Sequence, residues 1–234
     1  MLDKNLIEEK FKNSIDFYDD NAIIQNLMAK KLLSLIDRSE FDDILEIGSY
    51  SGVLTKKIIE KINFKSYLAL DIVDSFAKIK NLSDKISFLQ IDVEEFKCNK
   101  KFDLIIANAS LQWCNDFQKT IKKLKSYLNE DGILAITTFA TDNFYEIKDA
   151  FQISLKYQTI EEIQNIFSNN AKIIQEIHTL QFKNSKELLE HLKLTGVNAI
   201  SKNTLTFKEI KIGLEIIEKK YQNKLTYKPV YIID

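Results

Sequence analysis

The stretch ILEIGSYSG, residues 44–52, decides how the rest of this sequence is interpreted. A short apolar run stops at Gly48, and a second glycine follows at Gly52, so the stretch predicts a buried strand that turns into a helix. Glycine lacks a Cβ atom, which lets the backbone of such a turn approach a ligand closely. The middle of the turn, where a third glycine is common, holds Tyr50. The stretch therefore predicts a cofactor-binding loop. Whether the loop can bind a cofactor depends on where the Tyr50 side chain points.

Strands and helices alternate from this stretch onward. Strands are expected at residues 42–48, 65–72, 85–92, 101–110 and 133–139, with helices between them at 51–62, 74–82 and 116–132. This alternation predicts right-handed crossovers and a mostly parallel sheet. The strands are nearly all apolar, which indicates that helices cover both faces of the sheet. The fold class is therefore α/β.

The two ends of the chain follow other patterns. Residues 4–36 have helical periodicity throughout. Beyond residue 140, helices are expected at 142–156, 159–168, 185–196 and 206–222, and two further strands at 171–182 and 226–234. These strands bring the expected total to seven.

The composition excludes several classes of protein. About 45% of the 234 residues are apolar and the net charge is −1, so the chain as a whole does not resemble a nucleic-acid-binding protein. No apolar run approaches the roughly 20 residues that span a bilayer, and the charged N-terminus is unlike a secretory signal, so we expect a cytoplasmic protein. The two cysteines share no motif and are expected as free thiols, and the two histidines are too scattered to predict a metal site.

Polar side chains follow the ends of the first four strands. Glu46 and Gly48 end the first strand, Asp71 the second, Asp92 the third and Asn108 the fourth. Ligands of open α/β sheets bind beyond the carboxyl ends of the strands. Asp71 is placed to accept hydrogen bonds from ribose hydroxyls, and Asp92 can accept one from an adenine amino group. One such aspartate alone would be an ordinary turn residue, but three acids at successive strand ends predict a nucleoside site.

The glycine spacing separates two candidate cofactors. A dinucleotide loop would need glycines at positions 50 and 53, which hold Tyr50 and Val53. This disfavours NAD and an oxidoreductase. S-adenosyl-L-methionine has no phosphate and carries a positive charge, so the acids Glu46, Asp71 and Asp92 match it better. We therefore expect S-adenosyl-L-methionine as the cofactor.

Several segments resemble a known family. The stretch at 44–52 resembles the first motif of class I S-adenosylmethionine-dependent methyltransferases. FDLIIANASLQWCNDF, residues 102–117, is similar to the fourth-strand segment of the malonyl-acyl carrier protein O-methyltransferases of biotin synthesis. FKNSIDFYDDNAIIQ, residues 11–25, and ELLEHLKLTGVNAI, residues 187–200, resemble its opening helix and substrate-side segment. The chain departs from the family at Tyr50 and at Asn13, which stands where a basic residue is common.

The resemblance implies a Rossmann-like class I methyltransferase fold. It implies one domain over residues 1–234, with an N-terminal helical lid at 1–40, a cofactor-binding core at 41–140, and substrate-side helices and last strands at 141–234. Tyr18 is expected as a lid residue, and Gln112 and Trp113 are expected to face the site of methyl transfer. The implied cofactor-binding residues are Glu46, Gly48, Ser49, Gly52, Asp71, Ile72, Asp92, Val93 and Asn108.

The activity implied is transfer of a methyl group to the free carboxylate of a malonyl thioester on acyl carrier protein, or on malonyl-CoA. A carboxylic acid with a pKa near ~4 is already ionised at neutral pH, so no general base is needed. Trans-aconitate methyltransferases contain a similar fourth-strand run, so a small-carboxylate methyltransferase is the alternative. A second alternative is a non-catalytic protein that binds S-adenosylmethionine. Lysines around residues 195–198 and on the next expected helix are candidates for contact with an acidic carrier protein: Lys183, Lys186, Lys193, Lys202, Lys208 and Lys211.

Overall fold

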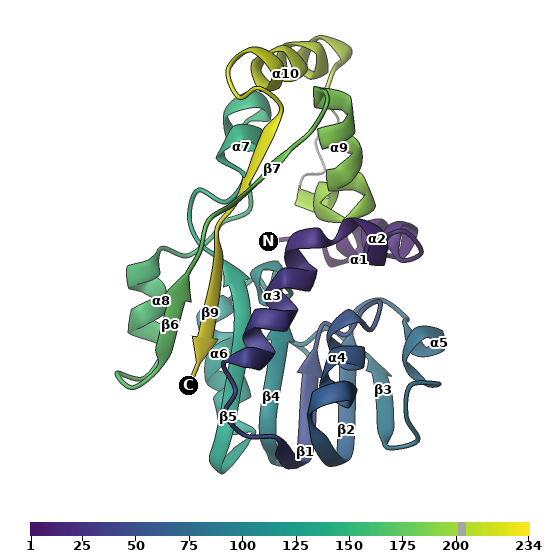
Figure 1. The fold of residues 1–234 in the computed structure, drawn as a ribbon, viewed down its shortest axis with the longest axis vertical. Coiled ribbons are helices and arrows are strands. Elements are labelled where there is room, and N and C mark those ends of the chain that lie inside the picture. Colours follow the sequence, from purple (N-terminus) through teal and green to yellow (C-terminus); the bar gives the residue numbers. More distant parts are fainter. Residues whose placement is uncertain (201–204) are drawn as a thin grey trace.

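A seven-stranded sheet forms the base of the molecule (Figure 1). The computed structural model describes residues 1–200 and 205–234. The strand order is β3-β2-β1-β4-β5-β9-β6, and β9 alone runs antiparallel to its neighbours. The expected mostly parallel seven-stranded sheet is confirmed. Its strands are β1 (Glu40–Ile47), β2 (Asn63–Asp71), β3 (Ile86–Gln90), β4 (Phe102–Asn108), β5 (Leu128–Phe139), β6 (Lys172–Gln175) and β9 (Pro229–Ile233).

Helices cover both faces of this sheet, as the apolar strands predict. The helices α3 (Ile23–Ser34) and α4 (Val53–Lys61) contribute to the core on one face, and α6 (Phe117–Ser126) and α8 (Ile160–Ile166) to the core on the other. Side chains alternate between the two faces along each strand. In β1, Ile44 belongs to the first core and Leu45 to the second. Between β2 and β3 lies the short helix α5 (Phe76–Ile79), which is shorter than the sequence predicts.

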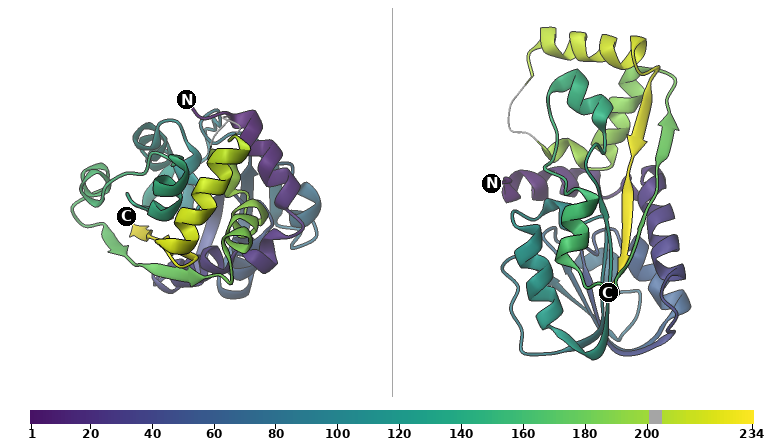
Figure 2. Two further views of the ribbon diagram at one scale, coloured as in Figure 1. Left: turned by 90° about the horizontal axis from the view of Figure 1, so that it is seen from above. Right: turned by 90° about the vertical axis from the view of Figure 1, so that its left-hand side faces the viewer.

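The N-terminal helical segment is three helices rather than one. They are α1 (Lys4–Ser14), α2 (Tyr18–Asn21) and α3, and the chain bends at residues 15–17 and at Ala22, whose ψ of 51° is not helical. The side chain of Asp3 caps α1 by accepting from the backbone N–H groups of Asn5 and Leu6. Figure 2 shows α1 lying across the carboxyl edge of the sheet.

The two late strands are each divided, which the sequence did not indicate. β6 is followed by β7 (His178–Gln181), and β8 (Lys224–Tyr227) precedes β9. β7 pairs with β8 in a separate two-stranded sheet, so the two pairs form an antiparallel ribbon that leaves the large sheet and rises above it (Figure 1). The ribbon bends where Lys228 donates its N–H to the Asn143 side chain at 2.9 Å instead of continuing the pairing.

The ribbon carries helices that stand above the sheet. They are α9 (Ser185–Leu194), the 3-10 turn η2 (Val197–Ile200) and α10 (Phe207–Lys219); together with α7 (Tyr145–Phe151), which contacts α10, we call them the cap. Two further expected helices were too long. The helix expected at 142–156 is α7, which ends at Phe151, and the one expected at 116–132 is α6, which ends at Ser126, because Leu128 begins β5 by pairing with Phe102. The short 3-10 turn η1 (Leu111–Trp113) follows β4.

Candidate functional site

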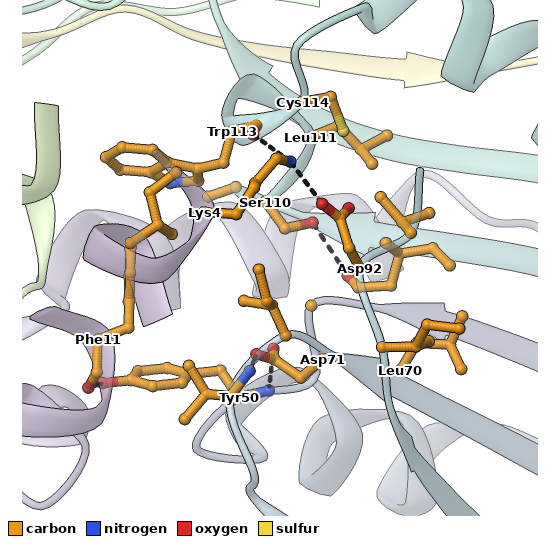
Figure 3. A pocket seen from close by; sticks show the side chains of 18 of the residues that line it. Lys4, Phe11, Tyr50, Leu70, Asp71, Asp92, Ser110, Leu111, Trp113 and Cys114 are labelled. Atoms are coloured by element: carbon orange, nitrogen blue, oxygen red, sulfur yellow. Dashed lines mark hydrogen bonds and ion pairs between the residues drawn. The ribbon is translucent and has the colours of Figure 1, made fainter. Parts of the chain in front are cut away.

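A pocket with about 730 Å³ of empty space lies at the carboxyl edge of the sheet (Figure 3). We call it the main pocket. Its sheet-side wall includes Gly48, Asp71, Asp92 and Asn108, from the ends of four strands or the turns that follow them. Its roof comes from α1, which contributes Lys4, Ile7 and Phe11. The structure therefore brings together side chains that the sequence spreads over more than a hundred positions.

Asp71 is held by backbone donors at the end of β2. Its Oδ2 accepts from the N–H of Tyr50 at 2.9 Å, and its Oδ1 accepts from the N–H of Val73 at 2.8 Å. Only 8% of the residue is exposed. This burial raises the pKa of Asp71 to about 7, against the opposing effect of the backbone N–H groups. Each carboxylate oxygen retains a lone pair with which to accept from a ligand hydroxyl.

Asp92 lies at the other end of the main pocket and is paired with Lys4. The Lys4 ammonium is 2.9 Å from Asp92 Oδ2 and 2.7 Å from Glu94 Oε2, and it donates to the Trp113 carbonyl at 2.9 Å (Figure 3). Burial acts to raise the pKa of Glu94, but the backbone N–H of Asn115 and the Lys4 ammonium lower it to about 2. The first residue of α1 is thus attached to the wall of the pocket.

Gly48 adopts a backbone conformation that other residues rarely take, with φ at +76°. A Cβ atom added there would lie 2.3 Å from Cβ of Ser110. The Ser110 hydroxyl also donates to the carbonyl of Ile47 at 3.0 Å, so the loop after β4 crosses directly over the glycine. The glycine is needed for this crossing, which the sequence argument about ligand approach did not anticipate.

Tyr50 belongs to the wall of the main pocket and faces α1. Its φ is +41°, and only 7% of the residue is exposed. The hydroxyl donates to the carbonyl of Phe11 at 2.5 Å and lies 3.0 Å from the Ser14 hydroxyl. Its ring is edge-on to Phe11 and Tyr18, with centroids 5.4 and 4.7 Å away. The residue that interrupts the glycine pattern therefore attaches the N-terminal helices to the loop, and its own N–H still binds Asp71.

Glu46 lies apart from the pocket. Its place in β1 puts the side chain on the same face as Ile44, beneath α4, where Oε2 accepts from Thr55 and from Tyr67, each at 2.6 Å. The residue is fully buried, and burial raises its pKa to about 7. Glu46 thus supports the glycine loop from behind instead of lining the space in front of it.

The other expected residues divide among neighbouring spaces. Ile72, Val93, Tyr18 and Trp113 line the main pocket, whereas Ser49 lines a small hollow behind the glycine turn. Gly52, with φ at +81°, is the N-cap of α4 and lines none of these spaces. Gln112 lines a second, smaller pocket between the sheet and the cap, which we call the cap pocket. Tyr18, Phe11, Ala109 and Trp113 line both the main pocket and the cap pocket, so the two are adjacent.

Many residues that line these spaces were not among the expected site residues, and Lys4 and Gln25 are two polar examples. Lys4 precedes any recognisable motif, and no pattern in the sequence indicates that it reaches Asp92. Gln25 lines the cap pocket and the hollow behind the glycine turn. Its position in the segment 11–25, at the family spacing from Phe11 and Tyr18, was a signal that could have identified it.

Comparison with known proteins agrees with this arrangement. A methyltransferase-domain family matches residues 21–200. A malonyl-[acyl-carrier protein] O-methyltransferase of Calditerrivibrio nitroreducens is 36% identical, over 97% of this chain and 94% of that protein. This chain belongs to that family. A second member, from Chlorobium luteolum, is 28% identical over 99% of this chain and 95% of its own length.

Solved structures show the same fold at lower identity. The YcgJ protein of Bacillus subtilis superposes with a TM-score of 0.63 at 14% identity, covering 88% of this chain and 96% of that one. The N-methyltransferase NodS of Bradyrhizobium japonicum, solved with S-adenosyl-L-homocysteine, has a TM-score of 0.57 at 14% identity and covers 97% and 96%. The Rossmann-like methyltransferase fold is confirmed, and this chain is an S-adenosylmethionine-dependent carboxyl O-methyltransferase by family. None of the described helices is both long and apolar enough to cross a bilayer.

Proposed function

We propose that this protein transfers a methyl group from S-adenosyl-L-methionine to the free carboxylate of malonyl-acyl carrier protein, an early step of biotin synthesis. The convergence of Asp71 and Asp92 on one pocket supports the cofactor, and the relatives' names support the acceptor. A cytoplasmic location, expected from the sequence, is part of the same proposal.

The residues of the main pocket fit the cofactor. Asp71 would accept from the ribose hydroxyls and Asp92 from the adenine amino group, with Ile72 and Val93 as apolar neighbours. Gly48 and Asn108 would lie at the amino-acid end, with Ser49 in the adjoining hollow and with Gly52 and Glu46 holding the loop. When bound, S-adenosylmethionine supplies an electrophilic methyl group. Tyr18 and Trp113 line the junction of the main and cap pockets, where they would exclude water and align the acceptor with the methyl group, and Gln112 would face the acceptor.

Alignment and exclusion of water are the contributions that this site can make to the rate. Holding two reactants in line can supply on the order of 7–11 kcal/mol. No proton has to be removed from an acceptor carboxylate at neutral pH, so no side chain is assigned as a general base. The described residues that line the main pocket include no histidine, and this chemistry requires none.

A methylation assay that offers malonyl-acyl carrier protein, malonyl-CoA and trans-aconitate side by side tests the proposal. Malonyl-acyl carrier protein should give the highest kcat/KM, and the product should be its methyl ester. A preference for trans-aconitate would establish the small-carboxylate alternative. Binding of S-adenosylmethionine without methylation of any acceptor would indicate a non-catalytic binding protein.

The partner surface is proposed to lie on the cap. Lys186 and Lys193 are both on α9, where Lys193 lies 3.8 Å from Glu190 and is two-thirds exposed. Lys183 is exposed just before this helix, and Lys202 lies outside the described residues. These lysines would attract an acidic carrier protein, and the attraction would act mainly by raising the association rate.

A further inference from the structure

The cap pocket has no charged side chain among the described residues that line it. Aromatic and aliphatic side chains form most of its wall, and its polar groups include those of Tyr18, Gln25, Gln112, Tyr157 and Thr195. If the proposed function holds, this is the space in which the acceptor carboxylate meets the methyl group, because it adjoins the main pocket. A carboxylate usually binds to lysine or arginine in proteins. The described lining offers neither.

Two candidate cations are already engaged or neutral. The Lys4 ammonium is held by Asp92 and Glu94 on the wall of the main pocket. His191 is bonded to the Tyr227 hydroxyl at 2.6 Å, and burial lowers its pKa to about 4, so it carries no charge at neutral pH. Neither of these two side chains therefore offers a free positive charge to the acceptor.

The Gln25 side chain forms no hydrogen bond with a described residue, whereas Gln112, whose Oε1 is also without a partner, donates its amide to the Ala109 carbonyl at 2.6 Å. Only 5% of Gln25 is exposed, its Oε1 is buried without a hydrogen-bond partner, and its amide nitrogen donates to no described residue. Its backbone is fixed, because the carbonyl accepts from Asn108 Nδ2 at 3.0 Å, and Asn108 Oδ1 accepts from the Thr137 hydroxyl at 2.7 Å. Buried side-chain amides nearly always have hydrogen-bond partners, so an amide without one in a pocket points to a ligand that supplies the partner.

The Tyr18 hydroxyl is equally free among the described residues. Its ring is fixed edge-on against Tyr50, and the residue lines the main pocket, the cap pocket and the hollow behind the glycine turn. A carboxamide can present its N–H group by rotation, and a phenol donates one hydrogen bond. Gln25 and Tyr18 thus both line the cap pocket as uncharged donors, and Tyr18 also lines the main pocket.

We propose that the Gln25 carboxamide and the Tyr18 hydroxyl receive the acceptor carboxylate, and that its charge is balanced by the bound cofactor and by none of the described side chains. This inference rests on the proposed function. In the reaction an acceptor oxygen forms the new bond to the methyl carbon, the bond from that carbon to sulfur breaks with its electron pair left on sulfur, and no proton moves. The acceptor loses its negative charge, so a lysine here would bind the ground state more strongly than the transition state and slow the step. Neutral donors orient the carboxylate without that penalty.

The inference predicts that acceptor affinity depends on the charge of the cofactor. Malonyl-CoA should bind at least about tenfold more tightly to the protein saturated with sinefungin, whose amine is cationic, than to the protein saturated with neutral S-adenosylhomocysteine. The methyl ester of malonyl-CoA should show no such difference. Equal affinity for malonyl-CoA in the two complexes would overturn the charge argument.

Variants test the two donors. Gln25→Leu should raise the KM for the malonyl acceptor about tenfold or more and leave the affinity for S-adenosylmethionine within about twofold. Gln25→Glu should reduce acceptor binding further, with partial recovery as the pH is lowered. Tyr18→Phe keeps the ring and removes only the hydroxyl, so it serves if Gln25 variants fold poorly. Gln181→Leu, on β7 away from both pockets, is the matched control.

The outcomes separate this inference from the proposed function. If the wild type forms methyl ester but both Gln25→Leu and Tyr18→Phe retain its acceptor KM, the assignment of the donors is wrong and the function stands. If the wild type forms no ester with any malonyl acceptor, the proposed function fails and this inference fails with it.

Discussion

Cofactor affinity should depend on pH through Asp71. In the free protein burial raises the pKa of this carboxyl to about 7. A bound ribose would donate hydrogen bonds to the ionised form, which lowers the pKa in the complex. The carboxyl therefore has to lose its proton on binding whenever the pH is below 7. Affinity should be greatest above pH 7 and fall as the pH is lowered.

The magnitude follows from the ionised fraction of Asp71. With a pKa of about 7, roughly nine-tenths of the protein is ionised at pH 8 and roughly one-tenth at pH 6. The affinity for S-adenosylmethionine should therefore fall about tenfold between these values, which corresponds to ~1.4 kcal/mol. Calorimetric titration at both pH values, with uptake or release of protons followed in two buffers, measures this directly.

Two variants decide whether Asp71 is responsible. Asp71→Asn cannot ionise, so its affinity should be low and constant over this range. Glu46→Gln serves as the control, because Glu46 also has a pKa of about 7 but lies outside the pocket, and its loss should leave the pH dependence in place. A constant affinity of the wild type from pH 6 to pH 8, or an unchanged slope in Asp71→Asn, would refute the reasoning.

Four further predictions concern stability and the partner. Glu46 has its pKa raised from ~4.3 to about 7, so the folded protein holds the proton more tightly and loses stability as the pH rises through this window; Glu46→Gln should remove about 3 kcal/mol of this loss in urea unfolding. Tyr50→Phe should lower the free energy of unfolding by about 1 kcal/mol and make α1 more sensitive to protease. Gly48→Ala should cost roughly 2 kcal/mol or more, because φ is positive and the new Cβ has no room. Reversing Lys186 and Lys193 to Glu should slow methylation of malonyl-acyl carrier protein several-fold at low salt, because the acidic carrier protein is no longer attracted to α9. The rate of methylation of malonyl-CoA should not change.

Three of these predictions have a control or a result that would contradict them. Tyr127→Phe removes a comparable hydrogen bond, to the carbonyl of Phe96, and should lower stability without changing the cleavage of α1. A pH dependence of unfolding that is the same in Glu46→Gln and wild type would contradict the assignment of Glu46. Equal slowing on the carrier protein and on malonyl-CoA would indicate damage to the pocket, and normal rates on both would place the docking surface elsewhere.

The strand ends were the part of the site that the sequence could predict, because parallel strands bring their carboxyl ends to one edge. Asp71, Asp92 and Asn108 meet there for that reason. Glu46 shows the limit of the argument. The strand pattern located it at the end of β1, but its placement depends on which face it occupies, and only the packing against α4 determines that.

Contacts between distant segments account for the rest. Lys4 reaches Asp92 across 88 positions, and nothing local to either residue encodes the pair. The division of the two late strands also depends on distant partners, since β7 can leave the large sheet only because β8 leaves with it. Propensity predicts extended chain in both cases, and the change of sheet is decided by tertiary structure.

The ribbon has a consequence for how this enzyme could diversify. Its two strands enter and leave the cap side by side, with the N–H of Phe182 bonded to the carbonyl of Asn223 at 3.0 Å. The segment between Phe182 and Asn223 can therefore be replaced by another segment joined at the same two adjacent points, without altering any strand of the large sheet. Recombination at these two points would give an enzyme that still binds its nucleoside cofactor and accepts a different substrate.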